Sequence, residues 1–172
     1  MKKNIFQKEA KKAFLIELNE LKAFYASKDF NVGDLCQEIL NCKGKVFLTG
    51  VGKSGHIANK ISATLTSTGT PSHFIHATEA SHGDLGGIKK DDCVIAISNS
   101  GETSELNNII QFTKRFNIKL ISITSNSKSI LHKNSTIGIL YKKPIEACPL
   151  NLAPTSSTSM SMIIGDCLAI SL

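Results

Sequence analysis

The first 40 residues carry apolar side chains at helical spacing. Apolar residues three or four positions apart form one stripe over residues 6–25, which predicts an amphipathic helix. A second stripe covers residues 32–40 after Asn31, a residue type that commonly begins helices, and Gly44 follows as a stop signal. We therefore expect residues 1–44 to form an N-terminal helical hairpin that packs on the rest of the protein.

Beyond Gly44 the pattern changes to short, almost wholly apolar runs. Such runs are typical of strands covered on both faces, as in a parallel sheet. Most are followed by a Gly- or Ser-rich loop and then a helical pattern, which predicts an α/β fold over residues 45–172: a three-layer, doubly wound, flavodoxin-like domain with a five-stranded parallel sheet. The runs are Val46–Leu48, Ser72–Ile75, Cys93–Ile97, Leu120–Ile123 and Thr136–Leu140.

In doubly wound folds ligands bind beyond the carboxyl ends of the strands, so the first such loop, Gly50–Gly55, is a candidate site. Its glycines permit close backbone approach, and it opens a helix whose free N–H groups suit an anion. It is not a Walker P-loop, because Phe47 stands where that motif needs glycine. The spacing matches a dinucleotide fingerprint, but the first acidic residue downstream is Glu79, after the second strand. We favour a phosphosugar loop in which Lys53 reaches the substrate, with a plain surface lysine as the alternative.

A second loop, Ser98–Glu105, is rich in hydroxyl groups and also lies between a strand and a helix. Phosphate accepts hydrogen bonds from such groups, and the helix dipole reinforces them. Helix capping is the alternative, although capping needs only one or two of these residues. The segments Ser122–Ser127 and Pro154–Thr158 repeat the pattern. Together the loops predict a hydroxylated, phosphorylated ligand.

The histidines favour proton transfer over metal binding. His73 and His76 share a predicted strand at an offset of three, which places them on opposite faces. His76 and His82 could converge on an adventitious zinc ion, but we expect no required metal. His82, in a His-Gly-Asp segment, is a candidate site residue because histidine titrates near neutrality.

Composition indicates a soluble protein that binds a small anion. The chain is 41% hydrophobic and 20% charged, and no run reaches the roughly 18 apolar residues of a membrane helix. The lysine-rich N-terminus has neither the uninterrupted apolar stretch nor the small-residue cleavage site of a signal peptide, so we expect a cytoplasmic protein without a membrane partner. The net charge of +6 comes from scattered lysines and one arginine, Arg115. This distribution is unlike a nucleic-acid-binding face but would attract an anionic substrate.

The five cysteines form no C-x-x-C pair, which argues against a disulfide framework or a zinc ribbon. We expect Cys93 and Cys167, which lie in apolar stretches, to be buried as small hydrophobic residues.

Four segments together resemble the sugar isomerase (SIS) family, and specifically its arabinose 5-phosphate isomerases. They are GVGKSGHIANK, TSTGTPSHFIHATEASHGDLG, VIAISNSGETSE and EACPLNLAPTSSTSM, and they run from Gly50 to the final helix. The resemblance implies that residues 45–172 are an SIS domain that interconverts D-ribulose 5-phosphate and D-arabinose 5-phosphate through an enediol. It further implies a role in Kdo synthesis for lipopolysaccharide or capsule, no required cofactor, and a homo-oligomer, typically a tetramer.

Family members often carry two CBS domains and a further site histidine after the SIS domain. The final predicted helix, Thr155–Leu172, ends without a stop signal. We therefore expect the natural protein to continue beyond it.

The family motifs assign catalytic roles to Lys53, Glu105, Glu146 and His82. We expect Glu105 to be the base, with Glu146 as alternative, and its pKa would need raising by burial to act near neutrality. First-turn stabilisation of a helix dipole is the other explanation of Glu105. Lys53 would stabilise the enediolate or bind phosphate, and His82 would assist proton transfer.

The motifs and loop chemistry also predict a set of substrate-binding residues, of which His76 is also the candidate ligand of an inhibitory zinc ion. They are Gly52, Ser54, Gly69, Thr70, His76, Ser98, Asn99, Ser100, Gly101, Thr103, Ser104, Thr124 and Ser156.

Two rival functions follow from the same family. SIS domains also act as non-enzymatic sugar-phosphate sensors in transcription regulators, but those usually add a basic helix-turn-helix module, for which the roughly 45 residues before the sheet are too few. An SIS isomerase for glucosamine 6-phosphate or sedoheptulose 7-phosphate is the other rival. The EACP and APTSST segments disfavour it.

Overall fold

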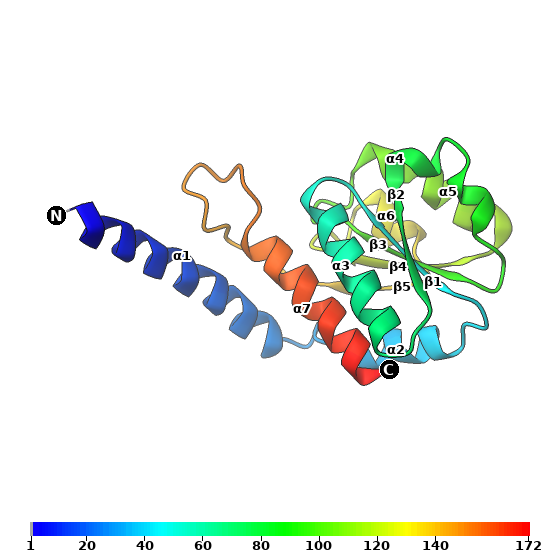
Figure 1. Cartoon of the computed structure of the whole chain (residues 1–172), viewed down its shortest axis with the longest axis horizontal. Helices are drawn as coiled ribbons and strands as arrows, with labels where there is room; N and C mark the ends of the chain where they lie inside the picture. Colours follow the sequence, from blue (N-terminus) through cyan, green and yellow to red (C-terminus); the bar gives the residue numbers. More distant parts are fainter. Residues whose placement is uncertain (1) are drawn as a thin grey trace.

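A computed structural model describes residues 2–172 and consists of a parallel five-stranded sheet between two helical layers (Figure 1). The strand order β2-β1-β3-β4-β5 is that of a flavodoxin-like, doubly wound fold and confirms the predicted fold class. The strands lie within two residues of the predicted runs. They are β1 (Val46–Gly50), β2 (Ser72–His76), β3 (Cys93–Ile97), β4 (Lys119–Thr124) and β5 (Ile137–Leu140).

Alternate strand side chains enter two separate hydrophobic clusters, one on each face. Leu48 and Ile95 face the cluster with α2 (Val32–Leu40), α3 (Lys53–Ser67) and α7 (Ser156–Ser171). Phe47 and Val94 face the other cluster. That cluster is covered by α4 (Ala77–Ala80), α5 (Asn107–Phe116), α6 (Ile130–Asn134) and the short 3₁₀ helices η1 (Asp84–Gly87) and η2 (Ser104–Leu106). Burial on both faces explains why the strands read as continuous apolar runs.

The two N-terminal helices are present, and both pack against α7. The first, α1 (Lys2–Tyr25), contacts the core through its last turns, where buried Phe24 meets Tyr141 edge to face at 6.2 Å between ring centroids. Its earlier turns extend away from the body (Figure 1), and Phe6 and Phe14 are 72% and 68% exposed. Most of the predicted apolar stripe, including Tyr25 in the last turn, therefore faces solvent in this chain.

Two loops cross at the amino edge of the sheet, held by the buried side chain of Asp92. Its carboxylate oxygens accept hydrogen bonds from the backbone N–H groups of Lys45 and Lys89, each at 2.7 Å. A Cβ on Gly44 would lie 2.1 Å from Asp92 Oδ1, so only glycine fits there. Gly44, predicted as a helix stop, is thus required for this loop crossing, four residues beyond the end of α2.

Helices α3 and α7 lie side by side on one face of the sheet, and they approach closely at Gly165. A Cβ on Gly165 would stand 2.3 Å from Ile61 Cδ1. The absence of a side chain at this position allows the two helices to pack at their present separation.

Candidate active site

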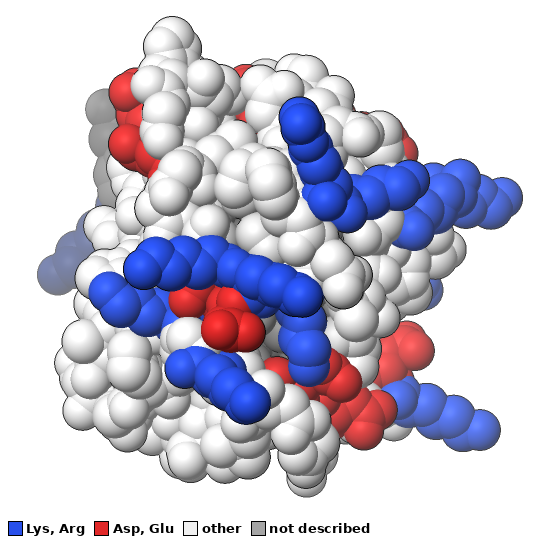
Figure 2. Space-filling view, turned by 90° about the vertical axis from the view of Figure 1, so that its right-hand side faces the viewer, with Lys and Arg blue, Asp and Glu red and all other residues white. Residues whose placement is uncertain are grey.

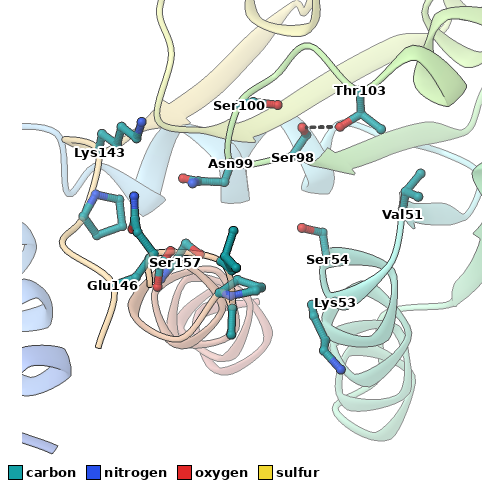
Figure 3. Close-up of a pocket in the computed structure, with 15 residues that line it drawn as sticks. Val51, Lys53, Ser54, Ser98, Asn99, Ser100, Thr103, Lys143, Glu146 and Ser157 are labelled. Carbon is teal, nitrogen blue, oxygen red and sulfur yellow. Dashed lines mark hydrogen bonds between the residues drawn. The ribbon is translucent and has the colours of Figure 1, made fainter. Parts of the chain in front are cut away.

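A pocket of about 410 Å³ opens at the carboxyl edge of the sheet, where the chain leaves neighbouring strands β1 and β3 for opposite faces. This is the topological switch point at which doubly wound folds bind ligands, and the volume suits a small molecule. Ser98 and Asn99 lie on one side, and Glu146 and Ser157 on the other (Figure 3). The lining residues are Val51, Lys53, Ser54, Ser98, Asn99, Ser100, Thr103, Lys143, Pro144, Glu146, Asn151, Leu152, Ala153, Pro154 and Ser157.

The loop after β1 turns sharply into α3. Gly52 precedes the helix with φ 57° and ψ −127°, a conformation in which any other residue would be strained. The next two residues, Lys53 and Ser54, begin α3 and line the pocket. The exposed side chain of Lys53 points away from the Ser98 side in Figure 3, so it must reorient to meet a ligand bound there.

The loop after β3 is braced by its own hydroxyl groups. Ser98 Oγ is 2.8 Å from Thr103 Oγ1 and accepts the backbone N–H of Gly101 at 3.0 Å. Gly101 has φ 67°, and a Cβ there would lie 2.2 Å from Ser129 Oγ. The buried Ser98 hydroxyl is therefore committed to holding the loop. The exposed Ser100 hydroxyl accepts the backbone N–H of Glu102 at 3.2 Å and keeps its own proton to donate to a ligand.

A hydrogen bond from a buried core residue orients the side chain of Asn99. The hydroxyl of Tyr141, which is 2% exposed, donates a 3.2 Å hydrogen bond to Asn99 Oδ1. Burial raises the pKa of Tyr141 to about 12, so this hydroxyl keeps its proton at neutral pH. With Oδ1 occupied, Asn99 can offer its amide N–H groups to the pocket.

Glu146 belongs to the segment between β5 and α7, and its carboxylate contacts the first residues of α7. Its Oε2 accepts from the backbone N–H and the hydroxyl of Thr155, at 2.6 and 3.0 Å, and from the N–H of Ser157 at 3.4 Å. Burial pushes the pKa of Glu146 upward, but the hydrogen bonds from Ser157 and Thr155 outweigh it, so the pKa lies below its ordinary value. The side chain is a carboxylate held in place through Oε2.

Of the four predicted catalytic residues, the structure brings Lys53 and Glu146 to the pocket and leaves Glu105 and His82 outside it. Glu105 is fully exposed in η2. Hydrogen bonds from its own backbone N–H and from the Ser104 hydroxyl, the latter at 2.8 Å, lower its pKa. The burial expected to raise that pKa is absent in this chain. His82 is also exposed and follows α4.

The predicted substrate-binding residues divide in the same way. Five line the pocket, namely Ser54, Ser98, Asn99, Ser100 and Thr103, while Gly52 and Gly101 shape the two loops. Gly69 and Thr70 follow α3, which runs back from the carboxyl edge, so they lie at the opposite edge of the sheet.

Other predicted hydroxyl groups serve the fold instead of facing the pocket. Thr124 and Ser156 are fully buried, and they donate to the carbonyl oxygens of Asn99 at 3.2 Å and Ile145 at 2.6 Å. Ser104 is exposed and bonded to Glu105.

Sequence reasoning missed pocket residues between β5 and α7, chiefly Lys143 and Asn151, whereas Ser157 lies in the predicted Pro154–Thr158 segment. The available signal was position: Lys143 stands shortly after the fifth strand, at the edge where ligands bind. It was overlooked because this segment has no glycine-rich turn and no helix directly after the strand.

His76, the predicted zinc ligand, is the last residue of β2. His76 is exposed, and its Nδ1 accepts the backbone N–H of Thr78 at 3.3 Å, which leaves Nε2 for another partner. Within residues 2–172 no three metal-binding side chains come together, so zinc at His76 stays a prediction. In the same range, no helix combines the length and apolar character needed to cross a bilayer.

Comparison with known proteins gives consistent matches. The SIS domain family model matches residues 39–171. The chain is 48% identical over 166 residues to the arabinose 5-phosphate isomerase KdsD of Francisella tularensis, and 46% identical over 170 residues to KdsD of Escherichia coli K12. These alignments cover 95% and 97% of this chain and 51% of each relative, so the chain spans about half the length of the curated relatives.

Among solved structures, a protein of E. coli CFT073 in complex with arabinose 5-phosphate superposes with a TM-score of 0.95 and 39% identity. The match covers 99% of this chain and 91% of that one.

Proposed function

The chain belongs to the SIS domain family, and we propose that it is the sugar-phosphate-binding domain of an arabinose 5-phosphate isomerase, which interconverts D-ribulose 5-phosphate and D-arabinose 5-phosphate. One observation carries the proposal beyond the resemblance. The pocket combines hydroxyl and amide donors on one side with an ionised carboxylate, Glu146, on the other, and lysines at its rim. This is the equipment needed to hold an anionic sugar and move a proton.

The donors of the β3 loop suit the phosphate and the sugar hydroxyls. Ser100 and the amide group of Asn99 face a ligand while Ser98 and Thr103 hold the loop. Lys53 and Lys143 supply positive charge from two different elements. Charge-assisted hydrogen bonds to phosphate are the strong ones, so we assign most of the binding free energy to this group.

The isomerisation needs one base that acts twice. In the open-chain aldose, Glu146 Oε1 would take the proton from C2, and the electron pair would pass into the carbonyl to form an enediolate. The proton returns to C1, and a proton shift between the two oxygens leaves the ketose. Lys53 or Lys143 would stabilise the negative oxygen of the intermediate. The electron pair of the C2–H bond reduces the carbonyl of the same molecule, so the reaction needs no external oxidant or reductant. We therefore propose that no cofactor is required.

Glu105 remains the alternative base. Its exposed position in this chain disfavours it, because a carboxylate in water gains none of the desolvation that strengthens a base. We retain His82 as a candidate for moving protons among the sugar hydroxyls.

The wider role follows the relatives. We propose that the reaction feeds Kdo synthesis for lipopolysaccharide or capsule, that the protein acts in the cytoplasm, and that it forms a homo-oligomer, with a tetramer as the expected state. The exposed apolar side chains of α1, such as Phe6 and Phe14, support self-association. Zinc bound at His76 would inhibit.

The test is turnover of ribulose 5-phosphate by the purified chain, followed by NMR of the anomeric products, with Glu146→Gln and Glu105→Gln compared side by side. We expect Glu146→Gln to lower kcat by at least about 100-fold while sugar-phosphate binding persists, and Glu105→Gln to have a smaller effect. The reverse order would return the base to Glu105. Binding of arabinose 5-phosphate without any turnover by the unmodified chain would favour the sensor function, and absence of both would refute the proposal.

A further inference from the structure

Thr155 stands at the N-cap position of α7, but its side chain does not cap that helix. A threonine at an N-cap commonly accepts a hydrogen bond from an N–H group in the first helical turn. In this chain the carboxylate of Glu146 takes that place, because its Oε2 accepts the N–H of Ser157, the second residue of α7. The Thr155 hydroxyl is therefore available for other partners.

The hydrogen bonds of this hydroxyl have a single consistent direction. Thr155 Oγ1 accepts the backbone N–H of Ala147 at 2.8 Å. An ionised carboxylate can only accept, so the hydroxyl proton is donated to Glu146 Oε2, 3.0 Å away. The backbone N–H of Thr155 donates to the same oxygen at 2.6 Å, and Ser157 supplies a third donor. Since Oε2 is fully occupied by these donors, a proton taken from a substrate would go to Oε1.

Two lysines share the pocket with Glu146, Lys53 of α3 and Lys143 of the segment between β5 and α7. Burial, and to a smaller extent the charge of Glu146, raises the pKa of Tyr141 to about 12, so this phenol stays neutral. On α1, Glu17 is bonded to a hydroxyl in the first turn of α7. Lysines on the side turned away from the β5–α7 segment lie among acidic residues (Figure 2), and exposed charges are largely screened beyond about 8 Å. Direct hydrogen bonds therefore influence Glu146 more than the overall charge does.

The same region also closes one wall of the pocket. Ser156 Oγ donates to the carbonyl oxygen of Ile145 at 2.6 Å, beside the hydrogen bond between Ala147 and Thr155. Residues 151–154 of the loop that is closed in this way line the pocket. A substitution at Thr155 can thus act through Glu146 or through the wall, and an experiment has to separate the two effects.

We propose that Thr155 is a positioning residue for Glu146, whose hydroxyl holds Oε2 so that Oε1 is directed at the substrate carbon that loses its proton. The inference rests on the proposed isomerase function. A base must lie close to the C–H bond and in line with it, and a displacement of about 1 Å can cost roughly 100-fold in rate. Without the hydroxyl, Oε2 keeps only backbone donors and the Ala147 N–H loses its acceptor, so the carboxylate is held less firmly.

The experiment measures turnover of arabinose 5-phosphate by the full chain and its variants, the Kd of the sugar phosphate, and the pH dependence of kcat. In Thr155→Val, which keeps the shape of the side chain, we expect kcat to fall roughly 10- to 100-fold while Kd changes less than about 2-fold. Burial raises the pKa of Glu146 and the hydrogen bonds from Ser157 and Thr155 lower it. Losing one of these bonds should therefore move the acidic limb of kcat to higher pH.

Two further variants separate the hydroxyl from the rest of the side chain. Thr155→Ser restores the hydroxyl, and we expect it to recover both kcat and the position of the acidic limb. Thr158→Val is the matched control one turn further along α7, because the Thr158 hydroxyl donates to the carbonyl oxygen of Thr155 at 2.8 Å. Its kcat should stay within about 2-fold of that of the unmodified chain.

The inference is overturned if Thr155→Val leaves kcat and the acidic limb unchanged, or if Thr155→Ser loses as much as the valine variant. A loss confined to Kd, or an equal loss in Thr158→Val, would also overturn it and assign Thr155 to the pocket wall. Circular dichroism checks each fold, and Thr155→Ala replaces the valine variant if that one does not fold.

A second readout does not depend on turnover. ¹³C NMR titration of the Glu146 carboxyl carbon, assigned with Glu146→Gln, should give a higher pKa in Thr155→Val than in the unmodified chain. An unchanged titration would refute the effect of Thr155 on Glu146. An unmodified chain that binds the sugar without converting it would instead refute the proposed function, so the two failures are distinguishable.

Discussion

The phenol oxygen of Tyr141, buried among core side chains, is 3.2 Å from Oδ1 of Asn99 at the wall of the pocket. The residues come from different strand ends, Tyr141 directly after β5 and Asn99 after β3. A single hydrogen bond therefore transmits the rigidity of the core to an amide group that a ligand would touch.

Removing this hydroxyl tests that relationship. In Tyr141→Phe the ring still fills the core, but Asn99 loses about 1 kcal/mol of orienting interaction. We expect KM for the sugar phosphate to rise roughly 5-fold while kcat changes less than 2-fold, since about 1.4 kcal/mol corresponds to tenfold. Steady-state kinetics and calorimetric binding measure the two effects. An unchanged KM together with a lower melting temperature would mean that Tyr141 only supports the core.

Glu146 should contribute to stability in a pH-dependent way. Because its folded pKa lies below its ordinary value of 4.5, its contribution is present above that pH and is lost as pH falls through the folded pKa. Glu146→Gln should cost about 1 kcal/mol at pH 7, a figure reduced for partial solvent screening. Thermal melts of both proteins at several pH values check this. A difference that grew toward low pH would contradict it.

Gly101 should tolerate no side chain. Its φ is 67°, and Ser129 Oγ would stand 2.2 Å from an added Cβ. We therefore expect Gly101→Ala to lose about 2 kcal/mol or more of stability and to weaken sugar-phosphate binding. Gly86→Ala is the matched control, because a Cβ at Gly86 meets nothing within 4 Å. Urea unfolding compares the two variants. Equal midpoints would show that the β3 loop adapts.

Alkylation of Cys42 should titrate well below the range of an ordinary thiol. With a pKa of about 6, its thiolate fraction, and hence its rate with iodoacetamide, should rise with pH to half its maximum near pH 6. Peptide-resolved labelling between pH 5 and 9 measures the profile. The buried Cys36, whose pKa burial raises, is the comparison and should react only at high pH. A shared profile for the two would rule out activation of Cys42.

Local pattern was sufficient for the fold, as shown by the five apolar runs that became the five strands. It also found the pocket side of the sheet, since Ser54 and the Ser98–Thr103 turn follow strands. The family motif also assigned Gly69 and Thr70 to the substrate. They follow α3, which runs from the pocket edge of the sheet to the opposite edge, so in this chain they lie away from the pocket. The exposure of Glu105 was equally invisible in the sequence.

What the sequence could not supply were pairs of residues far apart along the chain. Tyr141 and Asn99 have no local pattern that joins them. The contact arises because β3 and β5, distant in sequence, end at the same edge of the sheet with only β4 between them. Such pairs depend on tertiary packing, which periodicity does not encode.

Gly165 and Ile61 each lie roughly two turns below the residues with which α7 and α3 enter the pocket, Ser157 and Lys53. Since these helices touch at Gly165, the gap between their upper ends depends on a glycine that no ligand reaches. A larger side chain at Gly165 would push α3 and α7 apart and so increase the distance between Lys53 and Ser157 at the pocket. The width of the pocket therefore depends on the packing between two helices as well as on the residues that line it.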